Sequence, residues 1–153
     1  MRASQCFRFE EDFTASLRCI PMAVRRKLDL AGVKLKLVHW AALDLQDRQR
    51  LLDWPDQDEA VQALRAWLLE RTAALPDGPA RLLPPACAEP WQQREQWPDG
   101  VVRSADQLGL VLRPEGWQRL EELQRFALVK LSHPGHEHRN LPRALQEFGL
   151  IEP

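Results

Sequence analysis

The stretch from Phe7 to Trp40 constrains the fold most strongly, because it holds apolar residues at helical spacing together with a proline and a glycine where helices begin and end. Phe9, Phe13 and Leu17 recur every four residues, which places three large apolar side chains on one face of a helix. The carboxylates at positions 10–12 would then lie in the first turn, where the helix dipole favours negative charge. A first helix is therefore expected across these residues.

A second helix is expected after Pro21, because the N–H that proline lacks has no helical partner in a first turn. Ile20, Val24 and Leu28 continue the apolar face, and Gly32 follows as a left-handed C-terminal cap. The stretch therefore predicts a helical hairpin.

The residues after this hairpin present two alternatives. Val33, Leu35 and Leu37 alternate with lysines, a pattern that in isolation is typical of a strand. No second run in the sequence alternates convincingly, and a lone strand has no partner. We therefore expect a turn into a short helix that carries Leu37, Trp40 and Leu43.

Apolar stripes and capping residues indicate five further helical segments. These are a segment capped by Asp44 that ends before Pro55, one at 57–72 opened by a capping box of Asp56 and Glu59, a short one at 104–108, one at 114–131, and a last one capped by Asn140 and closed by Gly149. The predicted fold class is all-α, with residues 1–153 forming one compact domain of about five to seven helices.

A long irregular excursion is expected at residues 75–100, which hold six of the twelve prolines. Trp91 and Trp97 lie within it. Two large indoles favour a segment that is packed on the helices over a free linker. The alternative is that these tryptophans are exposed for a partner.

Composition excludes several classes of protein. Hydrophobic residues make up 44% of the chain and charged residues 28%, which is ordinary for a globular domain and too apolar for a disordered one. The net charge of −1 provides no overall field for nucleic acid or for an anionic membrane. Any anion site must therefore be local.

The N-terminal residues lack the apolar core of a secretory signal, and no apolar run reaches the roughly 18 residues of a membrane span, so a cytosolic protein is expected. Cys6, Cys19 and Cys87 are odd in number and widely spaced. This spacing disfavours a disulfide framework and a paired-cysteine metal site, and it favours reduced, mostly buried thiols.

The main basic cluster lies within and just after the hairpin, at Arg18, Arg25, Arg26, Lys27, Lys34 and Lys36. Such a cluster can meet a carboxylate, a phosphate or an acidic protein surface. The alternative is the solvated face of an amphipathic helix. Nucleic acid is disfavoured, because no recognised motif frames the cluster and an acidic DQDE run follows it.

A second concentration of polar groups surrounds a Pro-Gly turn, where His133, His136, Glu137 and His138 provide three imidazoles and a carboxylate. Zinc and copper sites use neutral imidazole, so His133, His136 and His138 form an alternative metal site. No metal is favoured, because the spacing matches no familiar motif and histidines also cap helix C-termini.

Catalytic motifs are missing from the sequence. It contains no glycine-rich phosphate loop and no GxSxG elbow, and its carboxylates are dispersed. Cys19 beside Arg18 is a possible activated thiol, since a neighbouring cation lowers a thiol pKa, but no histidine can be assigned to it from spacing. An enzyme is therefore not expected.

Several uncommon strings resemble the nitrate reductase-associated protein family, which comprises small proteins of oxygenic photosynthetic bacteria. The resemblance is carried by FRFEEDF, SLRCIPMAVRRKLD, GVKLKL with Trp40, and ALVKLSHPGHEHRNLPRALQEFGL. It spans most of the chain, is strongest at residues 7–40 and 126–150, and thins out in the proline-rich middle.

This resemblance implies an accessory role in producing active assimilatory nitrate reductase, through binding of the enzyme or its immature form. The partner would carry molybdopterin and an iron–sulfur cluster, whereas this chain would bind no cofactor itself. The family implies no catalytic residues. Arg18, Arg25, Lys27, Lys34 and Lys36 are the candidate docking face, with His136 and Asn140 as a second candidate patch.

Overall fold

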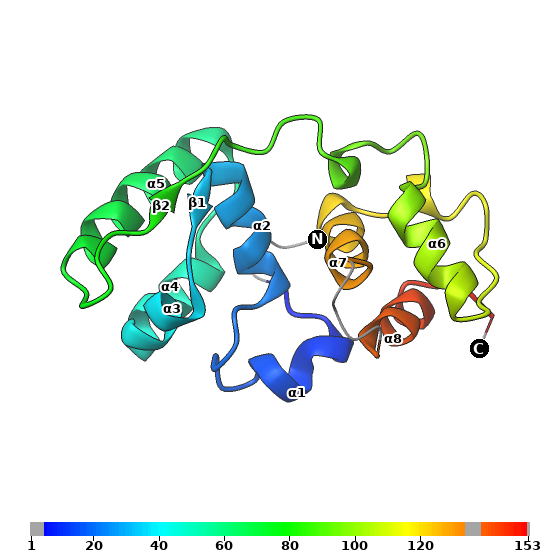
Figure 1. Cartoon of the computed structure of the whole chain (residues 1–153), viewed down its shortest axis with the longest axis horizontal. Coiled ribbons are helices and arrows are strands. Elements are labelled where there is room, and N and C mark those ends of the chain that lie inside the picture. The colour runs from blue at the N-terminus through cyan, green and yellow to red at the C-terminus, as the bar shows by residue number, and fades with distance from the viewer. Residues whose placement is uncertain (1–4, 134–138, 153) are drawn as a thin grey trace. The chain divides into compact units, whose positions relative to one another are not determined.

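The computed structural model describes residues 5–133 and 139–152, and Figure 1 traces its elements in chain order from blue to red. The chain divides into two compact units, Met1–Cys87 and Ala88–Pro153, and each is described by itself. The described residues form seven α-helices of six or more residues, a one-turn helix α1, three short 3-10 helices and one two-stranded sheet. The all-α prediction is confirmed, and the single domain stays a prediction.

The first unit is built mainly from helices that pack against α2. Its elements are η1 (Arg8–Glu10), α1 (Glu11–Thr14), α2 (Met22–Ala31), β1 (Val33–Lys34), α3 (Leu37–Ala42), α4 (Leu45–Asp53), α5 (Asp58–Ala73) and β2 (Arg81–Leu82). Helix α2 packs against both α4 and α5. The predicted apolar positions Val24 and Leu28 are buried in this core, together with Leu64 and Leu68 of α5.

The first half of the predicted hairpin is shorter than expected. The helix ends at Thr14, and Leu17 adopts a left-handed backbone conformation with φ of 57°. That turn presents the Leu17 carbonyl to the buried indole of Trp40, whose Nε1 donates to it at 2.8 Å. The chain therefore reverses early, because a tertiary hydrogen bond favours a conformation that a helix cannot supply.

The Glu10 side chain joins the two halves of the hairpin through hydrogen bonds. Its side chain is fully buried, with 0% exposure. Oε1 accepts from the backbone N–H of Phe7 and Oε2 from that of Met22, both at 3.1 Å. One carboxylate thus satisfies N–H groups at the starts of two helices, which otherwise lack helical partners. The sequence indicated only a first-turn carboxylate here.

Glu10→Gln is expected to lower the free energy of unfolding by about 2 kcal/mol, because an amide keeps one acceptor and turns a donor toward a second N–H. Urea denaturation measures the change. Glu11→Gln is the matched control, since Glu11 is adjacent in sequence and exposed. Equal effects of the two substitutions would contradict this role for Glu10.

The expectation that no strand follows the hairpin is wrong at two residues. Val33 pairs with Leu82 and Lys34 with Arg81 in an antiparallel ladder, and the predicted short helix then follows as α3. The partner lies inside the proline-rich excursion, where a two-residue strand shows no alternation of its own. In Figure 1, β1 leads from the end of α2 into α3.

The second unit contains η2 (Pro90–Gln92), α6 (Asp99–Gln107), η3 (Trp117–Arg119), α7 (Glu122–Leu131) and α8 (Asn140–Glu147). The predicted helix at 114–131 is interrupted between η3 and α7. Buried Arg125 is the physical reason, because its Nη1 donates to the Leu120 carbonyl at 2.6 Å and its Nε to the Trp91 carbonyl at 2.9 Å. Those bonds satisfy carbonyls that an unbroken helix would not present.

The tryptophans of the excursion pack onto the second unit, as predicted. Trp91 is buried and meets Phe126 edge-on, with ring centroids 5.1 Å apart. Trp97 is half-buried beside Trp117, and its Nε1 donates to the Pro114 carbonyl. Among the described residues, no helix has the length and apolarity needed to cross a membrane.

Of three predicted helix N-caps, one is confirmed and two are wrong. Asp44 caps α4 through a 2.8 Å bond from the Asp47 N–H, as predicted. Asp56 does not cap α5, since Gln57 holds that position and Asp56 pairs with Arg26 at 2.9 Å. Asn140 is the first residue of α8 rather than its cap. Short polar side chains fit either role, so longer-range partners decide between them.

Candidate docking surface

Among the predicted docking residues, Lys27 departs most from the expected exposure, because its side chain is buried. Its side chain has 0% exposure, and Nζ donates to the carbonyls of Leu51, Leu52 and Trp54 at 2.8, 2.6 and 2.9 Å. Three donors therefore meet three carbonyls at the end of α4. Burial lowers the pKa of Lys27 to about 8, against an opposing contribution from nearby carboxylates. The ammonium caps a helix from inside the first unit.

Arg25 and Arg26 are both half-buried on α2. The Arg25 guanidinium contacts the Met22 sulfur at 3.9 Å. Burial lowers the pKa of Arg25, while the carboxylates of Asp29 and Glu10 oppose the shift. Arg26 is held by its ion pair with Asp56. These two cations are therefore largely committed within the unit.

Three cations remain exposed around the sheet. Lys34 and Lys36 were predicted from the sequence, and Arg81 was missed, because only the pairing of β1 with β2 brings it opposite Lys34. Side chains directly opposite each other in a ladder are neighbours, so two positive charges lie side by side, which is destabilising by itself. None of the three forms an ion pair within the part of the chain that the structure describes.

Exposed apolar side chains lie in the same two segments. Leu37 is 59% exposed, Val38 51% and Leu82 50%. Leu82 pairs with Val33 and therefore lies on the other face of the ladder from Lys34 and Arg81. We call the five residues Lys34, Lys36, Leu37, Val38 and Arg81 the ribbon surface. Exposed apolar side chains near cations that form no ion pair among the described residues are a combination that interfaces use, with contact area from the former and orientation from the latter.

The other predicted basic residue, Arg18, is exposed in the loop after α1 and has no ion pair among the described residues. It precedes half-buried Cys19. Cys6 and Cys87 are exposed, so the expectation of mostly buried thiols is wrong. Partial burial and the neighbouring Glu10 carboxylate raise the pKa of the Cys6 thiol, which disfavours a reactive thiolate there.

The second predicted patch is only partly described. His136 and His138 lie outside the described residues, His133 is exposed, and half-buried Asn140 accepts a bond from Arg143 at 3.4 Å. No group of three or more potential metal ligands occurs among the residues that were placed. The alternative metal site therefore stays a prediction.

Comparison with known proteins identifies one family. The pattern described as conserved nitrate reductase-associated protein matches residues 6–148, which include most of both units. No curated protein and no solved structure matches the chain. The family expected from the sequence strings is thereby confirmed.

Proposed function

The chain belongs to the conserved nitrate reductase-associated protein family, and we propose that it is a non-enzymatic accessory factor that binds nitrate reductase or its immature form through protein–protein contact. The observation that supports this proposal best is the ribbon surface, where Lys34 and Arg81 lie opposite each other and form no ion pair with any residue that the structure describes. The partner, rather than this chain, would carry molybdopterin and an iron–sulfur cluster.

An acidic surface of the partner would relieve the repulsion within the ribbon. Lysine and arginine would steer the encounter, and their contribution would weaken with salt, because exposed charges are screened. Leu37 and Val38 would supply the apolar area that slows dissociation. The docking step therefore has a defined chemistry, in which acidic groups of the partner meet Lys34 and Arg81 and apolar groups meet Leu37 and Val38.

The proposal is tested by co-purifying nitrate reductase with the tagged protein and measuring affinity by surface plasmon resonance. Lys34→Glu with Arg81→Glu is expected to weaken binding by about tenfold or more. The matched control is Arg103→Glu with Arg119→Glu, an identical charge change at exposed positions of the second unit. Wild-type affinity in the ribbon variant, or unchanged nitrate reductase activity after deletion of the gene, would overturn the proposal.

Lys34→Glu alone separates binding from stability. A glutamate opposite Arg81 converts a repulsive pair into an attractive one, so the free energy of unfolding is expected to rise by roughly 0.2–1 kcal/mol. Binding is expected to weaken at the same time. If Lys34→Glu is more stable and binds nitrate reductase less well, the surface serves a partner at a cost in stability. Tighter binding by this variant would contradict the proposal that the partner surface is acidic.

A further inference from the structure

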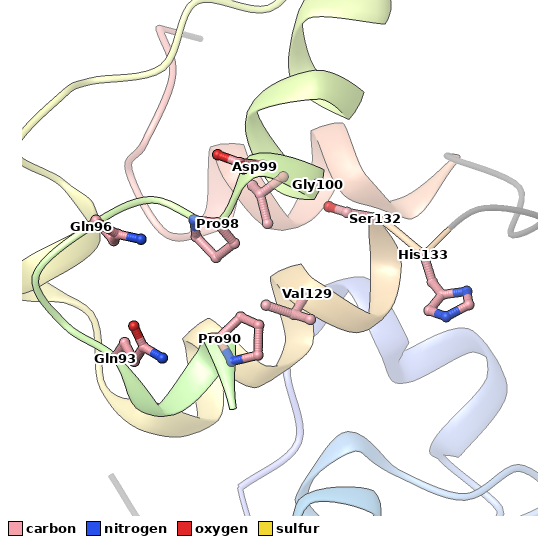
Figure 2. Close-up of a pocket in the computed structure, with 10 residues that line it drawn as sticks. Pro90, Gln93, Gln96, Pro98, Asp99, Gly100, Val129, Ser132 and His133 are labelled. Carbon is pink, nitrogen blue, oxygen red and sulfur yellow. The ribbon is translucent and has the colours of Figure 1, made fainter. Parts of the chain in front are cut away.

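A pocket of about 410 Å³ lies within the second unit, between η2, the start of α6 and the end of α7. Its volume is within the range of small-ligand sites. In Figure 2, Pro98 and Gly100 border one side of the space and Pro90 and Val129 the other, while Gln93 and Gln96 flank its end. Apolar walls with a few polar groups are the usual composition of such sites.

Gly100 is the feature of this pocket that the fold does not explain. It is the second residue of α6, in the first turn of the helix. Its φ is not in the left-handed region, and a Cβ placed on it would meet no atom of the described residues within 4 Å. Neither backbone geometry nor close packing requires glycine here. Its effect is to keep the wall of the pocket open.

The polar residues of the pocket are Gln93, Gln96, Asp99, Ser132 and His133, of which Asp99 and Gln93 favour a positively charged ligand. Asp99 is exposed at the start of α6, and its carboxylate has no hydrogen-bond or ion-pair partner among the placed residues. The Gln93 amide nitrogen donates to the Ala88 carbonyl, so the oxygen of that amide is left as an acceptor. An anion would meet the negative charge of Asp99, whereas an ammonium or guanidinium group would be bound by it.

We propose that this pocket binds a ligand with an ammonium or guanidinium group on an aliphatic chain. The chain would pack against Pro90, Pro98 and Val129, and the cation would bind the Asp99 carboxylate. A free amine and an arginine or lysine side chain of a partner protein share this chemistry. The inference is independent of the proposed docking role, because no residue of the ribbon surface takes part.

The proposal is tested by titrating the full chain with agmatine and with Nα-acetyl-arginine amide, and by following backbone amide shifts in ¹H–¹⁵N spectra. Saturable shifts at Gly100 and Val101 are expected, with a dissociation constant on the order of 1 mM for ligands of this size. Tighter binding of agmatine indicates a free amine, and tighter binding of the amide indicates a protein side chain. 1-Butanol, which has no cation, is expected not to saturate.

Two variants decide whether the pocket is responsible. Asp99→Asn is expected to weaken agmatine binding by about tenfold, since a hydrogen bond to a charged group is lost. Asp106→Asn removes the same charge from an exposed position on the same helix and is expected to bind like wild type. Gly100→Leu is expected to abolish binding while leaving the thermal midpoint unchanged or higher.

Any one of three results would overturn the proposal. The first is that neither cation gives saturable shifts, the second is that Asp99→Asn binds agmatine as tightly as wild type, and the third is that Gly100→Leu still binds undiminished. Because the docking test uses ribbon variants and a different readout, loss of nitrate reductase binding there would leave these results unaffected. The two proposals can therefore fail separately.

Discussion

Gly32→Ala is expected to lower the free energy of unfolding by about 2–4 kcal/mol, one of the two largest effects that the structure indicates. Gly32 ends α2 with φ of 73°, a region that costs an L-residue roughly 1–2 kcal/mol. A Cβ there would also collide with the backbone oxygen of Leu83. That segment cannot retreat freely, because the Leu83 N–H donates to the Gly32 carbonyl at 2.8 Å.

Gly78→Ala separates the two contributions. Gly78 has nearly the same φ, 76°, but among the residues that the structure describes no atom lies within 4 Å of a Cβ placed on it. Its substitution should therefore show the conformational cost alone, about 1–2 kcal/mol. Urea denaturation followed by circular dichroism gives both values. Equal losses for the two variants would mean that the approach of Leu83 contributes nothing to stability.

Gly32 also shows which parts of the fold could be predicted. The end of α2 followed from the local pattern, since an apolar stripe and then glycine are a helix and its cap. The close approach of Leu83 could not be predicted, because it depends on a pairing across about fifty residues of chain. A strand of two residues is too short for its alternation to be recognised.

The sequence pattern was least informative about the charged residues that are buried. Glu10 was predicted only as a first-turn carboxylate and Arg125 was assigned no role, yet each satisfies backbone groups that become available only in the folded chain. A sequence does not show which carbonyls and N–H groups a distant loop will leave without partners. Lys27 did carry one signal, because it lies three residues after Val24, on the buried face of α2.

The ribbon surface was predicted in part. Lys34 and Lys36 were selected from the basic cluster as candidate docking residues, and both are exposed. Arg81 lay in a segment with no usable period, so its contribution required the structure. The two lysines could therefore be predicted from local sequence, whereas the repulsive pair of Lys34 and Arg81 depends on tertiary structure.

Lys27→Met is expected to lower the free energy of unfolding by about 2–4 kcal/mol at neutral pH. Methionine fills a similar space but donates no hydrogen bond, so the three carbonyls at the end of α4 lose their shared donor. Exposed Lys34 provides the control, and Lys34→Met should change stability by no more than about 0.5 kcal/mol. Similar losses for the two lysines, measured by urea denaturation, would contradict the capping role.

The loss from Lys27→Met should also depend on pH. The folded chain releases the Lys27 proton near pH 8, while the unfolded chain keeps it up to the ordinary pKa of 10.5. Between these values the folded state binds fewer protons, so the contribution of Lys27 to the free energy of unfolding rises with pH. The difference between wild type and Lys27→Met should therefore grow from pH 8 toward 10.5, by up to about 3 kcal/mol. A difference that stays constant or shrinks across this range would show that the three carbonyls hold the proton in spite of burial.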